Sequence, residues 1–227
     1  MTSAAGKAQL LAETFGSKYT LSQAELNEYT ALVHRPCVAE DWTLPDEEQA
    51  EATLKAFKPE SATGPDGTPT RVLQKCAQEL AKPLVLLARR VLETCRWPEE
   101  WVTHWILPLY KKKSPWNPEN YRGVHLTSQV GKTVERLLQF VFGAYLASKE
   151  CAEENQFAYR KEREARDLLA LLVLTWLWSF EKGRNFCLYC SDVSEAFDRM
   201  STQRLTEKLH ALRVPQNWVA LFGSWLR

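Results

Sequence analysis

Apolar positions along the chain recur mostly at intervals of three and four, which predicts a helix-rich protein. Across Pro69–Cys95 they form one stripe, so this stretch is expected to be one helix or a pair of helices broken near Pro83. A helix over Glu164–Glu181 is apolar nearly all round and is therefore expected to be buried. Further helices are expected over Ala8–Phe15, Asp46–Phe57, Val130–Tyr145, Thr202–Leu212 and Gln216–Arg227.

Short apolar runs predict the strands. Trp105–Tyr110 and Val124–Thr127 flank a polar, basic segment, and we expect them to pair as a hairpin. Phe186–Ser191 predicts a strand by its length and aromatic content, and it would deliver Asp192 at its C-terminal end. Helices with a few strands between them predict an α+β fold.

Composition and charge exclude several classes of protein. The 227 residues are 45% hydrophobic and 25% charged, as in ordinary globular proteins, which excludes disorder, collagen and coiled coils. Residues 1–60 carry ten acidic and five basic side chains, so we expect an acidic, linker-like N-terminal segment there. The remainder is basic, which is compatible with a polyanionic partner. The longest apolar run is too short to cross a bilayer, and we expect no membrane association.

Two charged constellations could carry chemistry. The carboxylates of Asp192 and Asp198, at the end of a predicted strand, could bind Mg²⁺, whereas the alternative is a helix-capping Asp and an Asp facing water. One end of the predicted hairpin carries the cations Lys111–Lys113 and Arg122, which could bind a triphosphate or a nucleic-acid backbone. The alternative for these cations is a solvated basic turn.

A third candidate is the turn-forming segment Gly64-Pro65-Asp66-Gly67, whose backbone N–H groups could bind a phosphate. The alternative is that the segment is a plain turn before a helix. Most tryptophans, Trp105 among them, lie in apolar stretches and are expected in the core. The sequence has no P-loop, no G-x-S-x-G and no G-x-G-x-x-G, which disfavours three large enzyme classes.

Taken in order, these segments resemble the reverse transcriptase of non-LTR (LINE-like) retrotransposons. The resemblance covers residues 61–227, and five motifs in the right order and spacing are more specific than any one of them. The motifs are Gly64–Pro69, Trp105–Lys112, Asn120–Thr127 with Lys132 and Glu135, Glu154–Arg160, and Asp192–Asp198.

The resemblance implies a right-hand polymerase, of which residues 61–227 would be the fingers and the first part of the palm, truncated before the rest of the palm. The implied activity is RNA-directed DNA polymerase, a nucleotidyl transfer to a primer 3′-hydroxyl assisted by two Mg²⁺ ions. The implied partners are an RNA template, a DNA primer and deoxynucleoside triphosphates. Because the family copies RNA at nicked chromosomal DNA, the resemblance also implies an intracellular protein located in the nucleus.

Roles for single residues follow from the same resemblance. Asp192 matches the first catalytic aspartate, which binds both Mg²⁺ ions with the Val193 carbonyl alongside. Arg122 and Lys111 match cations that contact the triphosphate. The nucleotide pocket is matched by Ala196 and by Phe197, whose ring excludes a 2′-hydroxyl. Structural roles are implied for Asp198, Gly64, Asp66 and Gly67.

The sequence departs from the family in two ways. Gly123 stands where many members have proline, and no two aspartates are adjacent anywhere in the chain, although the family has an aromatic-x-Asp-Asp turn. We therefore expect a fragment that lacks the C-terminal palm and thumb segments and is inactive by itself. The alternatives are a non-catalytic RNA/DNA-binding remnant of a decayed or co-opted retroelement, and a relic without function.

Overall fold

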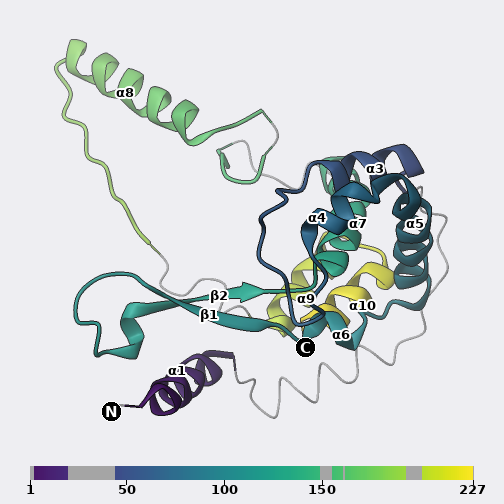
Figure 1. The fold of residues 1–227 in the computed structure, drawn as a ribbon. Coiled ribbons are helices and arrows are strands. Elements are labelled where there is room, and N and C mark those ends of the chain that lie inside the picture. Colours follow the sequence, from purple (N-terminus) through teal and green to yellow (C-terminus); the bar gives the residue numbers. More distant parts are fainter. Residues whose placement is uncertain (1–2, 20–43, 149–154, 161, 193–200, 227) are drawn as a thin grey trace. The chain divides into compact units, whose positions relative to one another are not determined.

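The computed structural model describes residues 3–19, 44–148, 155–160, 162–192 and 201–226, and they fall into two units. The first unit comprises residues 1–143 and 197–227, the second residues 144–196, and each is described by itself. The elements labelled in Figure 1 are helices with a single two-stranded sheet, which confirms the predicted α+β class at this level.

The predicted helix pair of residues 69–95 forms, but it breaks at a different residue. Helix α4 (Thr70–Lys75) and helix α5 (Ala77–Thr94) meet at Cys76, whose φ of −97° and ψ of 27° are not helical. Pro83 lies inside α5, so the expected break there is wrong. Pro83 is exposed, and the carbonyl that loses its hydrogen bond to the missing N–H can be solvated by water.

Helix α3 (Glu47–Lys55) contributes to the core of the first unit by packing against α5. Asp46 caps this helix by accepting a 2.9 Å hydrogen bond from the Gln49 N–H, as its acidic first turn predicts. Ala50 and Leu54 have no exposed surface. Residues 47–55 are thus core material, whereas the boundary expected between residues 60 and 61 stays a prediction.

The predicted hairpin is confirmed. Strand β1 (Trp105–Tyr110) pairs antiparallel with β2 (Tyr121–Leu126), and the register places Trp105 opposite Leu126 and Tyr110 opposite Tyr121. Strand β2 begins three residues earlier than the expected Val124, so that Arg122 lies within the strand. Two short elements, α6 (Glu99–Val102) and the 3-10 helix η1 (Pro118–Asn120), lie before β1 and before β2.

The remaining helices of the first unit also agree with the sequence pattern. Helix α7 (Gln129–Ser148) covers the predicted 130–145 stretch, and α9 (Thr202–Ala211) and α10 (Gln216–Trp225) cover the two C-terminal predictions. Trp218 of α10 is buried, with its ring 4.9 Å from that of Phe142 of α7. Helix α1 (Ala4–Tyr19) is longer than the predicted helix at the N-terminus.

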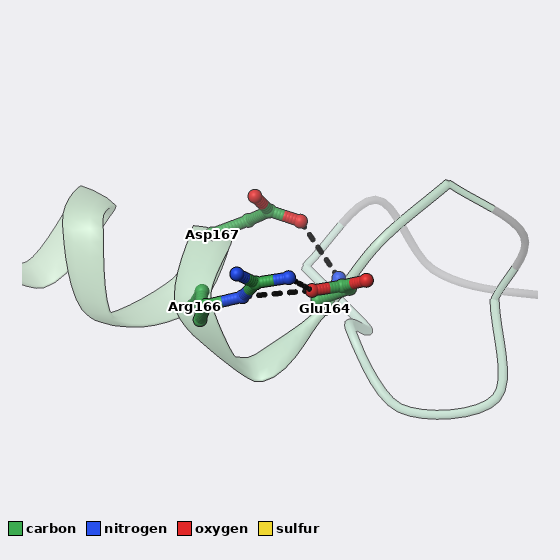
Figure 2. A network of polar contacts seen from close by, with 3 residues as sticks. All are labelled: Glu164, Arg166 and Asp167. Atoms are coloured by element: carbon green, nitrogen blue, oxygen red, sulfur yellow. Dashed lines mark hydrogen bonds and ion pairs between the residues drawn. The ribbon is translucent and has the colours of Figure 1, made fainter.

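Helix α8 (Ala165–Glu181) of the second unit forms where a helix is predicted, but it is not buried. Its first turn is closed by a capping box in which the Glu164 N–H donates to the Asp167 carboxylate at 2.7 Å (Figure 2). Within this unit the expected burial is not met, because burial needs a partner surface and α8 is the one complete helix among the described residues of the unit. Its exposed apolar side chains are Leu168, Leu169, Leu171, Val173, Leu174, Leu177, Trp178 and Phe180.

The strand predicted over Phe186–Ser191 does not form. Residues 184–192 are described without regular structure and are mostly exposed. A strand needs a neighbour to satisfy its backbone N–H and C=O groups, and the described residues of this unit offer none. Among all the helices described, none is both long and apolar enough to cross a membrane.

Candidate nucleotide and nucleic-acid site

The hairpin brings two of the predicted site residues onto one face. Arg122 is directly opposite Leu109 in the register, and the Lys111 N–H donates a 2.8 Å hydrogen bond to the Asn120 carbonyl, which continues the ladder beyond β1. Side chains alternate between the two faces of a strand, so Leu109, Lys111 and Arg122 share a face. Both cations are exposed. They can therefore act together on an anion.

An apolar stripe leads along the same face toward these cations. Trp105, Leu107 and Leu109 are each more than half exposed, so the prediction that Trp105 lies in the core is wrong. The opposite face is the one that packs, because the buried Phe15 of α1 lies close to Gly123, beside Ile106. A Cβ at Gly123 would lie 2.9 Å from the Ile106 methyl group, which explains why a small residue suits this position. The outer face stays open to solvent.

The loop Gly64–Gly67 is held against the start of α7. A Cβ at Gly64 would lie 2.5 Å from the Thr127 carbonyl carbon, so only glycine allows this approach. The Asp66 carboxylate accepts a 2.7 Å hydrogen bond from the Ser128 hydroxyl. The Gly67 N–H donates to the Gly64 carbonyl at 3.0 Å, and φ of Gly67 is +65°. These contacts are those of a structural turn, and a contact of its N–H groups with a phosphate stays a prediction.

Asp192 is exposed at the end of the irregular segment of the second unit. Val193, Ala196, Phe197 and Asp198 lie outside the described residues, and the roles expected for all five residues stay predictions. Within the described parts of the chain, no group of three or more His, Cys, Asp or Glu side chains could hold a metal ion. One carboxylate does not fit two Mg²⁺ ions, so the described residues do not by themselves form the predicted metal site.

A second feature of the first unit is an apolar pocket between α7 and α10, with a volume of about 220 Å³. Glu135 is its one acidic side chain, and burial raises the pKa of that carboxyl group, although Lys132 and Arg136 act in the opposite direction. The other lining residues are Trp97, Leu138, Gln139, Phe142, Trp218, Leu221, Phe222 and Trp225.

Sequence reasoning missed Trp116, which is 79% exposed in the loop between the two strands. The sequence signal was available, because this tryptophan stands among Lys, Ser, Pro and Asn residues with no apolar neighbour to pack against. A tryptophan outside any apolar period has no core position to occupy.

Comparison with known proteins gives three related sequences. No protein-family model matches the chain. It is 26% identical over 182 residues to the RNA-directed DNA polymerase from mobile element jockey of Drosophila funebris, and 25% identical over 164 residues to the jockey protein of Drosophila melanogaster. It is 25% identical over 185 residues to a probable RNA-directed DNA polymerase from transposon BS of Drosophila melanogaster. The matches cover 78%, 70% and 79% of this chain, respectively, but they span only about a fifth of each relative.

Proposed function

From the relationship of this chain to the RNA-directed DNA polymerases of non-LTR retrotransposons, we propose that residues 61–227 are the fingers and the start of the palm of a reverse transcriptase. The proposed reaction is nucleotidyl transfer to a primer 3′-hydroxyl. Its proposed partners are an RNA template, a DNA primer and deoxynucleoside triphosphates, and its proposed location is the nucleus. The acidic residues 1–60 would precede this domain in the sequence, although helix α3 packs against its helix α5.

The observation that carries the proposal is the shared face of Lys111 and Arg122. Arg122 lies within the hairpin register and Lys111 continues it by one residue, so alternation of side chains puts the two exposed cations on one face, where both can contact the oxygens of a triphosphate. The guanidinium of Arg122 offers a planar fork for two phosphate oxygens, and the ammonium of Lys111 adds a point charge.

Asp192 and the Val193 carbonyl would hold Mg²⁺, and Ala196 and Phe197 would line the nucleotide pocket. Two ions supply the metal chemistry of nucleotidyl transfer in this proposal. Because one carboxylate cannot neutralise and space two ions, further palm residues would have to complete the site. The isolated chain is therefore proposed to bind its substrates without polymerising them.

The first test measures binding of a deoxynucleoside triphosphate to the whole chain. Lys111→Gln and Arg122→Gln should each weaken binding several-fold, and Arg122→Lys should weaken it as well because the fork is lost. Lys75→Gln is the matched control, since Lys75 is an exposed lysine of the same unit on helix α4. Equal effects of Lys75→Gln and Lys111→Gln would contradict a specific triphosphate site.

The second test is primer extension on an RNA template with Mg²⁺. We expect no extension by the whole chain above background. Extension that disappears in Asp192→Asn would show that the metal site is complete, and the proposed inactivity would then be wrong.

The alternative function is a non-catalytic RNA/DNA-binding remnant. It is favoured by the contrast between exposed cations on the hairpin and the lack of a metal-binding group within the described residues. Binding of an RNA–DNA hybrid that depends steeply on salt and is unchanged by Asp192→Asn or by removal of Mg²⁺ would support it.

A further inference from the structure

The loop between β1 and β2 presents Trp116 to solvent, although tryptophan is usually a largely buried residue. Its exposed fraction of 79% exceeds that of Trp105 and Trp178, the next most exposed tryptophans described. An indole that is 79% exposed contributes little to stability by packing. A ligand that stacks on its face would account for the position.

Side-chain hydrogen bonds fix the backbone of this loop directly before Trp116. The Tyr110 hydroxyl donates to the Lys113 carbonyl, and the Tyr121 hydroxyl donates to the Pro115 carbonyl at 2.9 Å. The Asn120 amide donates to the Ser114 carbonyl at 2.8 Å. Because the backbone around the indole is held at several points, ordering it for a ligand costs little conformational entropy.

The charge around the indole selects the kind of ligand. Residues 111–122 contain four cations, Lys111, Lys112, Lys113 and Arg122, against one carboxylate, Glu119. The three lysines are exposed, and the last of them, Lys113, is separated from Trp116 by only two residues, Ser114 and Pro115. An exposed aromatic ring near a run of cations is suited to binding single-stranded nucleic acid, which carries both unstacked bases and phosphates.

We propose that the indole of Trp116 is a stacking platform for an unpaired nucleobase, while Lys112 and Lys113 contact the phosphates of the same single strand. The inference rests on the proposed function, since the strand would belong to the template class, but it assigns a residue and a binding mode that the predicted site does not contain. Stacking is tolerant of base identity, so the platform would bind any sequence.

The test measures binding of a fluorescent single-stranded RNA of mixed sequence to the whole chain over a series of salt concentrations. Trp116→Ala should weaken binding by about 5- to 100-fold, and Trp116→Phe should retain most of the affinity because its ring still stacks. The slope of log affinity against log salt should not change in Trp116→Ala, whereas it should fall in Lys112→Gln. Phe140→Ala is the matched control, because Phe140 is an exposed ring on α7 of the same unit.

A second arm separates bases from phosphates. Inorganic polyphosphate carries the charge without the bases, so its affinity should be the same for Trp116→Ala and the unchanged chain. Equal RNA affinities of Trp116→Ala and Phe140→Ala would overturn the stacking role while leaving the proposed function intact. If the unchanged chain does not bind single-stranded RNA at all, the proposed function fails and the inference fails with it.

Discussion

The hydroxyl of Ser128 donates a 2.7 Å hydrogen bond to the carboxylate of Asp66, which lies 62 residues earlier in the chain. Ser128 is buried and also accepts a 3.1 Å hydrogen bond from the Gly131 N–H, so it caps the start of α7. The Gln129 amide adds a 2.6 Å hydrogen bond to the Ala62 carbonyl. The turn before α4 and the junction of β2 with α7 are therefore joined.

Ser128→Ala should lower the free energy of unfolding by about 1–3 kcal/mol, because it removes a helix cap and leaves the Asp66 carboxylate without this donor. Urea denaturation of the whole chain measures the change. The double variant Ser128→Ala/Asp66→Ala should cost less than the sum of the two single variants, since both remove the same bond. Strictly additive costs would show that this hydrogen bond does not couple the two segments.

Gly64→Ala should be one of the most damaging single changes in the chain, with a loss of more than about 2 kcal/mol. The new methyl group would lie 2.5 Å from the Thr127 carbonyl carbon and oxygen, and backbone atoms cannot rotate away as a flexible side chain can. Gly143→Ala is the control, because nothing lies within 4 Å of a Cβ at this helical position and alanine favours a helix by up to about 1 kcal/mol. Thermal unfolding that ranks the two variants in the opposite order would refute the close approach.

Glu135 should make stability depend on pH. Burial raises the pKa of this carboxyl group in the folded state, so the folded chain binds its proton more tightly than the unfolded chain does. The contribution of this carboxyl group to the free energy of unfolding is fully present below its pKa in the unfolded chain, near 4.5. It is lost as the pH rises through the higher pKa of the folded chain. Glu135→Gln stays neutral and should be more stable than the unchanged chain at neutral pH.

The difference between Glu135→Gln and the unchanged chain should disappear as the pH falls below the unfolded value. Denaturation at a series of pH values measures it. Glu93→Gln is a control, since Glu93 is an exposed carboxylate that pairs with Arg90 at the surface of α5. A stability difference for Glu135→Gln that is the same at all pH values would contradict the desolvation of this carboxyl group.

Local pattern was sufficient for most of the elements. The spacing of apolar residues predicted α7, α9 and α10 within a few residues, because one face of each helix packs in the first unit. The hairpin was predictable because its two apolar runs flank a polar loop. The motifs also carried the resemblance to non-LTR reverse transcriptases, which the Drosophila relatives confirm.

Burial was less predictable than helicity. The apolar pattern of α8 predicted the helix correctly, but its exposed leucines show that an apolar surface is buried only where another element covers it. The same reason applies to residues 186–191, whose composition favours a strand although no neighbouring strand is described in their unit. Burial of a helix and pairing of a strand both depend on distant partner segments, which a local sequence pattern does not identify.

The sequence by itself determined most helices, the hairpin, the position of its cations and the family resemblance. These features depend on periodicity, turn residues and motif order, which can be read from residues close together in the chain. Only the tertiary structure decided that Lys111 and Arg122 share a face and that the Asp66 carboxylate is hydrogen-bonded to Ser128. The physical reason is that strand register, long-range hydrogen bonds and exposure depend on which distant backbone segments approach each other, and that choice is made by packing of the whole unit.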